Sequence, residues 1–153
     1  MKKRIFIIIV SLLVLVGVFA SCKEKEQYPI EILITEYSLV GTSCQWKNLN
    51  HNNKLVIINS NDVLRNYTTC TDGNYPEFDF SKWTLLVFSP SCCNIDSHVK
   101  QMLLQQLSKN KYLLTVGMIP SETANAAGKS ISALIPKTSD DSQIELDVTI
   151  IQN

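Results

Sequence analysis

Five cysteines carry most of the chemistry available to this chain of 153 residues. Four of them, Cys44, Cys70, Cys92 and Cys93, could form disulfides in an oxidising compartment, where four thiols allow three pairings. Structural zinc sites favour two to four residues between cysteines, and dithiol oxidoreductases use Cys-x-x-Cys. The adjacent Cys92 and Cys93 have neither spacing, so a metal or redox site that combines them with His98 is the weaker alternative. We therefore expect no metal and no cofactor.

No pattern of a catalytic centre accompanies the cysteines. The chain has five glycines but neither a Gly-x-Gly-x-x-Gly phosphate loop nor a Gly-x-Ser-x-Gly nucleophile elbow. His51 lies in a polar segment typical of a solvated turn, far along the chain from His98. Asp79 precedes Phe-Ser-Lys and is interpreted as a turn former rather than a catalytic acid. The sequence therefore predicts a protein that is not an enzyme.

The first 21 residues have the organisation of a secretory signal peptide. Three basic residues are followed by the uncharged residues 5–19, a run shorter than the roughly 20 apolar residues that cross a bilayer as a helix. We expect residues 1–21 to be removed. Their removal takes three of the 14 basic residues and none of the 14 acidic ones, which leaves a net charge of −3. A mildly acidic chain is not expected to bind nucleic acid.

The segment Phe19-Ala20-Ser21-Cys22 resembles the lipobox of bacterial lipoproteins. Its small residues fit a narrow peptidase pocket, and only a thiol forms the thioether to diacylglycerol, so the resemblance implies that Cys22 is lipidated. Two or more acyl chains, palmitate among them, anchor a protein stably, whereas one chain binds only marginally. The resemblance thus implies a lipoprotein of the cell envelope, at the periplasmic or the surface face of the outer membrane. Residues 22–28 would be its tether.

Residues 29–153 are expected to form a single domain of the α+β class, mostly β, either as one antiparallel sheet or as a sandwich- or barrel-like domain. Hydrophobic residues alternate with other residues as in half-buried strands. Other runs are apolar on both faces, as in central strands. The alternating segments are 30–35, 112–118 and 144–150, the central strands are 55–58 and 85–88, and a weaker strand spans 130–135.

One short helix is expected near residues 61–68. Ser60 or Asn61 could cap it, because their side chains accept hydrogen bonds from the first backbone N–H groups. Val63, Leu64 and Tyr67 would then face inward.

A second resemblance covers much of the domain. The segments Leu55-Val56-Ile57-Ile58-Asn59-Ser60, Asp79-Phe80-Ser81-Lys82 and Ala133-Leu134-Ile135-Pro136-Lys137 resemble small uncharacterised lipoproteins of Bacteroides-type bacteria. Their order is distantly similar to the C-terminal domain found in one component of a bacterial protease complex. These relatives imply a mostly β domain and supply no catalytic residues. The similarity also suggests a protease-associated or inhibitor-like role, with residues 120–128 as the inserted loop.

Two further expectations draw on this second resemblance. Residues 98–108 fit a helix by periodicity, but the resemblance favours a strand, and we predict a strand. Cys44 and Cys70 lie within the similar region, in segments interpreted as turns, and are the predicted disulfide. Cys92 and Cys93 are the least favoured pair, because adjacent cysteines bridge only with strain.

The expected function is that of an envelope lipoprotein, joined to the bilayer through acylated Cys22, that binds a protein or glycan partner. Trp46, Trp83, Tyr75 and Phe78 could line a carbohydrate-binding surface. At their spacings such aromatic residues more often pack in a core or at its rim.

Overall fold

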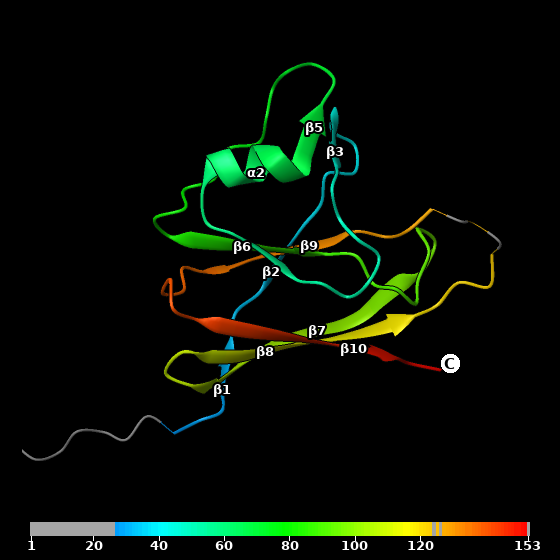
Figure 1. The fold of residues 1–153 in the computed structure, drawn as a ribbon. Helices are drawn as coiled ribbons and strands as arrows, with labels where there is room; N and C mark the ends of the chain where they lie inside the picture. The colour runs from blue at the N-terminus through cyan, green and yellow to red at the C-terminus, as the bar shows by residue number, and fades with distance from the viewer. Residues whose placement is uncertain (1–26, 124, 126, 153) are drawn as a thin grey trace, which may run out of the picture.

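Two four-stranded sheets lie face to face, and a smaller third layer covers one of them (Figure 1). The computed structural model describes residues 27–123, 125 and 127–152. The expected signal peptide, Cys22 and most of the tether lie outside these residues. The described part is mostly β with one short helix, as predicted. Among the predicted architectures, the structure matches the sandwich, because its sheets are not closed into a barrel.

Sheet A is the lower layer in Figure 1 and has the strand order β1-β7-β8-β10. β7 and β8 form a long antiparallel hairpin, so residues 98–108 are a strand, as predicted. β10 pairs in parallel with β8 and, within the described residues, has a neighbouring strand on that side alone. The bounds are β1 (Ile30–Ile32), β7 (His98–Ser108), β8 (Lys111–Ile119) and β10 (Gln143–Ile150).

Sheet B is the middle layer, antiparallel throughout, with the order β2-β9-β6-β4. β6 is buried along most of its length, which confirms the prediction of a central strand. The same prediction for residues 55–58 is wrong, because β4 is an edge strand. The residues of this segment are apolar because they contact the hydrophobic clusters on the two faces of sheet B, not because the strand is central. The bounds are β2 (Thr35–Tyr37), β4 (Val56–Ile58), β6 (Trp83–Phe88) and β9 (Ile131–Pro136).

The segment predicted as one strand over residues 30–35 is two strands. β1 pairs with β7 in sheet A, and β2 pairs with β9 in sheet B. Leu33 and Ile34 therefore carry the chain from one sheet to the other. An alternating pattern cannot reveal this crossing, because it continues unbroken through both strands.

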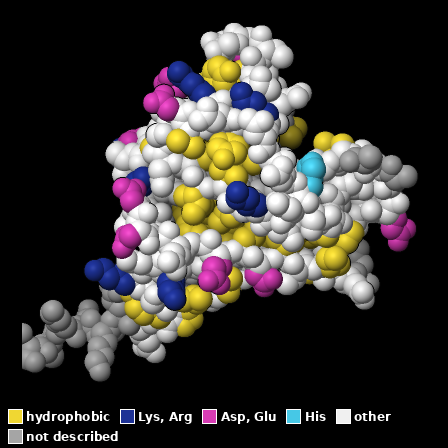
Figure 2. Space-filling view, viewed as in Figure 1, with side chains coloured by type: hydrophobic (Ala, Val, Ile, Leu, Met, Phe, Trp, Pro, Cys, Tyr) yellow, Lys and Arg dark blue, Asp and Glu magenta, His cyan; other side chains and the backbone are white. Residues whose placement is uncertain are grey.

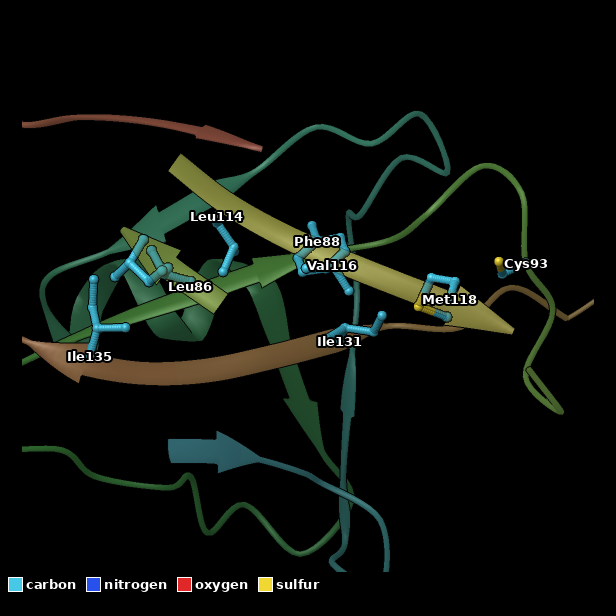
Figure 3. Close-up of a cluster of buried hydrophobic side chains, with 9 residues drawn as sticks. Leu86, Phe88, Cys93, Leu114, Val116, Met118, Ile131 and Ile135 are labelled. Carbon is cyan, nitrogen blue, oxygen red and sulfur yellow. The ribbon is translucent and has the colours of Figure 1, made fainter. Parts of the chain in front are cut away.

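The main core lies between the two sheets (Figure 3). Leu86 and Phe88 point from β6 toward sheet A, where Leu114, Val116 and Met118 of β8 meet them. Alternate residues of a strand face opposite sides, so Leu85 and Val87 point the other way, into a second core. β6 thus joins two hydrophobic clusters.

The third layer encloses that second core and contains α2 (Asn61–Tyr67), β3 (Cys44–Trp46) and β5 (Thr68–Cys70). Ser60 caps the helix as predicted, its side chain accepting from the Val63 N–H at 3.2 Å. Leu64 is fully buried, but Val63 remains 38% exposed, so the prediction that it faces inward is wrong. A helix of seven residues is too short to be stable in isolation, and it depends on packing through Leu64.

Candidate binding cleft

A disulfide ties together the two strands of the third layer. Cys44 of β3 lies directly opposite Cys70 of β5 in the antiparallel register, with 4.0 Å between their Cα atoms. This is the predicted pair, but the interpretation of both positions as turns was wrong. The short β3–β5 ribbon has few hydrogen bonds of its own, so the cross-link holds the position of Trp46 and the other residues of β3.

A cleft of about 500 Å³ opens beside this ribbon. Its aliphatic lips are Val40, which is 91% exposed, and Ile95, which is 52% exposed. The other residues that line it come from two separate parts of the chain: Tyr37, Ser38, Leu39, Gly41, Thr42, Cys44, Gln45 and Trp46, and then Gly128, Lys129, Ser130 and Ser132. No sequence pattern indicated this cleft, since its residues are brought together by pairing between distant strands.

The turn between β2 and β3 presents Val40 to solvent. The backbone N–H of Thr42 donates to the Leu39 carbonyl at 3.1 Å, and the Thr42 hydroxyl donates to the same oxygen at 2.7 Å. Gly41 has φ of +83°, a conformation that glycine adopts without the steric cost of a side chain. Leu39 is buried and serves as the base of the turn. Val40 is therefore exposed by a defined turn.

Ile95, the other exposed aliphatic residue of the cleft, is held by a second set of hydrogen bonds. Its N–H donates to the Ala127 carbonyl at 2.8 Å, and its carbonyl accepts from Lys129 Nζ at 3.3 Å. The neighbouring Asn94 side chain donates to the Thr123 carbonyl at 2.9 Å. These bonds join the segment before β7 to the segment before β9, so the lip has a fixed position.

The aromatic residues considered for a glycan surface pack mainly against other side chains. Tyr37 lies edge-on to Phe78 and to Trp46, with ring centroids 4.9 Å and 6.3 Å away. All three belong to the second core, and burial raises the pKa of the Tyr37 hydroxyl. The Tyr75 ring is covered by the guanidinium of Arg65, 5.7 Å from its centroid. Trp46 and Phe78 therefore contribute to the second core, and one face of the Tyr75 ring lies against Arg65.

A histidine and a serine that no sequence pattern connected lie together below the cleft. His51 Nδ1 hydrogen-bonds to Ser89 Oγ, and Ser89 Oγ donates to the Lys129 carbonyl at 2.7 Å. The single hydroxyl proton thus goes to the carbonyl, and the imidazole must donate its own N–H to the serine. A serine nucleophile needs the opposite polarity, with the imidazole accepting its proton. The pair ties the His51 turn to the end of β6, so His51 is exposed, as expected, and also makes a contact that the sequence did not indicate.

Cys92 and Cys93 follow in the same loop region. Their sulfur atoms are neighbours, but among the described cysteines Cys44 and Cys70 alone lie at disulfide distance, which agrees with the expectation that the adjacent pair is the least favoured. Cys93 is buried against the main core, whereas His98 is exposed at the start of β7. Within residues 27–123, 125 and 127–152, no group of three or more His, Cys, Asp or Glu side chains could hold a metal ion.

Asp79 has the structural role that was predicted for it. Its carboxylate accepts from the Ser81 N–H at 3.1 Å and from the Ser81 hydroxyl, and it forms an ion pair with Lys82 at 2.9 Å. These bonds, that from the Ser81 side chain first, lower the pKa of Asp79 to about 2. The carboxylate therefore closes a surface turn before β6 and stays charged.

Comparison with known proteins gives no identity for the chain. No protein-family model, curated protein or solved structure matches it. Both resemblances drawn from the sequence therefore stay predictions, as does the lipidation of Cys22, which lies outside the described residues. Among the helices of the described part, none is long and apolar enough to cross a membrane.

Proposed function

We propose that this protein is a lipid-anchored binding module of a bacterial cell envelope that holds a protein partner in the cleft between Val40 and Ile95. The anchor is the acylated Cys22 implied by the lipobox-like segment. The module itself performs no chemistry on its partner.

The observation that carries the proposal is that two exposed aliphatic side chains line one cleft. Val40 and Ile95 are 91% and 52% exposed although each stands on a segment fixed by hydrogen bonds. Exposing such side chains on ordered loops leaves apolar surface in contact with water, which a partner would cover. Between them, Ser130 and the partly exposed Trp46 and Gln45 offer polar and aromatic contacts of the kind found at protein interfaces.

A protein partner fits the cleft better than a glycan does. Sugar rings are recognised by the open face of an aromatic ring together with hydrogen-bonding groups, but Tyr37 and Phe78 are packed against each other inside the second core. The lips of the cleft are instead aliphatic, and aliphatic side chains gain most from contact with the apolar side chains of another protein.

The non-enzymatic part of the proposal is supported by the polarity of the His51–Ser89 pair. Ser89 is fully buried and its proton is committed to a backbone carbonyl. Turnover of a peptide, ester or glycan by residues 23–153, abolished by Ser89→Ala, would contradict this part directly.

Site-specific photo-cross-linking in cells tests the binding site. A benzophenone amino acid is placed at Val40, at Ile95 or, as the control, at Val63, an exposed aliphatic residue on α2 outside the cleft. We expect one discrete protein adduct shared by the Val40 and Ile95 sites and absent from the Val63 site. The double variant Val40→Ser/Ile95→Ser should reduce co-purification of that protein several-fold. Equal adducts at all three sites, or a glycan adduct, would refute the proposed cleft partner.

A protease-directed role is the second candidate, favoured by the way the segment over residues 120–128 is attached. The Ser121 N–H donates to Ser97 Oγ at 3.1 Å, and Thr123 Oγ1 donates to Asp96 at 2.6 Å. Inhibitory loops are similarly supported by hydrogen bonds to their scaffold. Inhibition of envelope proteases by the intact domain, lost when residues 122–127 are replaced by a short glycine linker, would favour this candidate over a non-inhibitory partner.

A further inference from the structure

We propose that the β1 edge of sheet A rests on the lipid bilayer, so that the cleft is held away from the membrane. The contact surface is the edge patch, which we define as Ile30, Leu33 and Leu107. The inference rests on the anchor at Cys22 that belongs to the proposed function, and it adds an orientation to it.

The edge patch consists of three exposed aliphatic side chains spread along the β1 edge of sheet A, with Ile30 on β1, Leu33 just after it and Leu107 on β7. Leu33 is 75% exposed and Leu107 is 43% exposed. Ile30 is paired with Gln106, the neighbour of Leu107, and Leu33 follows Ile32, which is paired with Leu104. Figure 2 shows hydrophobic side chains on the surface at the lower left, beside the point where the described chain begins. The patch therefore lies at the end of the molecule that the tether enters.

The length of the tether decides what can cover this patch. Six residue-to-residue steps separate Cys22 from Tyr28, and an extended chain spans at most about 3.5 Å per step, or roughly 21 Å. Since the acyl chains on Cys22 lie in the bilayer, β1 stays within that distance of the lipid surface. An apolar patch held so close to a membrane is presented to the interfacial zone, where apolar side chains of peripheral proteins are buried.

The charges around the patch favour an apolar contact rather than an electrostatic one. The exposed Lys109 and Lys111 of the β7–β8 turn are offset by the exposed acids Glu31, Asp140 and Asp141. Asn110 of that turn also hydrogen-bonds to Asp141, which places an acid beside the lysines. Without a net positive charge, attraction to anionic headgroups is weak, so the contact should be insensitive to salt.

Ile95, which lines the cleft, lies beyond the other end of β7. Ile95 comes just before β7 and Leu107 comes near its end, and the 11 residues of β7 span roughly 35 Å at about 3.3 Å per residue. A domain that rests on its β1 edge therefore presents Ile95, and the part of the cleft that Ile95 lines, at a distance from the lipid, where a protein partner can reach it.

Paramagnetic relaxation in nanodiscs tests the orientation. The full lipidated chain is reconstituted in discs of phosphatidylethanolamine and phosphatidylglycerol with a small fraction of gadolinium-chelating lipid, and backbone amide relaxation is measured by NMR. We expect the amides of β1 and of residues 105–108 to relax several-fold faster than those of Val40 and Ile95, at low and at high salt. The variant Ile30→Ser/Leu33→Ser/Leu107→Ser should reduce the difference several-fold, because the tether alone keeps β1 near the lipid without fixing the orientation, whereas Val40→Ser/Ile95→Ser should preserve it.

Three results would overturn the orientation. In the first, lipidated wild-type protein shows equal relaxation at both ends of β7, which refutes the orientation but leaves the anchor intact. In the second, the delipidated chain forms dimers that the triple serine variant abolishes, which assigns the patch to a second copy. In the third, intact mass shows an unmodified Cys22, which removes the anchor of the proposed function and this inference together.

Discussion

The imidazole of His51 lies directly over Gly128, closely enough that a β-carbon on residue 128 would overlap the ring. The glycine is needed here for this close approach rather than for an unusual backbone angle. It allows the ring to reach Ser89 and to connect the His51 turn with the strand end and with the segment that supports Ile95.

Gly128→Ala should therefore destabilise the domain by about 1–3 kcal/mol, the usual cost of inserting a methyl group where there is no room. The imidazole must move, and it then loses its hydrogen bond to Ser89. The check is chemical denaturation of four proteins: wild type, Gly128→Ala, His51→Ala and the double variant. Removal of the ring should restore most of the stability lost to the alanine. Two additive effects would show that the ring is not the obstacle.

Loss of the disulfide across β3 and β5 should cost about 3–4 kcal/mol in the chain-entropy model, since it closes a loop between cysteines that are 26 residues apart. The measurement is the guanidinium midpoint of Cys44→Ala/Cys70→Ala. The matched control is Cys92→Ala/Cys93→Ala, which removes two sulfurs that enclose no intervening chain. A larger loss for the control than for the first variant would contradict this account.

Two neighbours on α2 should respond very differently to the same substitution. Leu64→Ala opens a cavity in the second core and should cost about 2–5 kcal/mol, because Leu64 is fully buried against Leu85 and Val87. Val63→Ala lies on the same helix but is partly exposed, so it should cost less than about 1 kcal/mol. Thermal melts of both variants would check the difference. Similar losses would mean that the helix packs through a different face.

The turn at Asp79 should make stability depend on pH within a defined window. Its pKa in the folded protein is lowered to about 2 from the ordinary value of 3.8, mainly by the hydrogen bond from the Ser81 side chain and then by Lys82. A lowered folded pKa stabilises the protein above pH 3.8 and ceases to do so as the pH falls toward 2. Wild type should thus melt higher than Asp79→Asn near neutral pH, and the two curves should converge between about pH 4 and pH 2. A constant difference through that range would refute the carboxylate's role.

The strands with long hydrophobic patterns could be predicted from the sequence. In a pleated strand, alternate side chains point to opposite faces of the sheet, so the pattern shows which residues are buried. The patterns along residues 112–118 and 144–150 lead directly to β8 and β10. The same logic failed at Val63, where about two turns of helix offer too few residues to define a buried face. It also missed β3 and β5, whose short polar stretches become strands only through their mutual pairing and cross-link.

The cleft could not be predicted because the residues that line it are far apart in the sequence and come together only in the folded protein. Val40 and Ile95 stand 55 positions apart in the sequence, and neither belongs to a pattern that distinguishes a lip from an ordinary loop. The His51–Ser89 contact was missed for the same reason, since the pair depends on a bridge between a turn and a strand end. The parallel pairing of β10 with β8 could not be predicted either, because it depends on the path of the chain between the two strands and not on their composition.

The exposed edge of β10 affects whether crowded copies of this protein pair with one another. Along these eight residues, every second residue directs its backbone N–H and C=O to the open side, where they could template another strand. Antiparallel pairing of two such edges, with like faces aligned, would set Glu145 against Asp147 of the second copy, or Asp147 against its own equivalent. Carboxylates placed opposite each other in a ladder repel. Glu145 and Asp147 thus disfavour intermolecular strand pairing along the exposed edge of β10. Molecules packed densely side by side would therefore not join into continuous sheets.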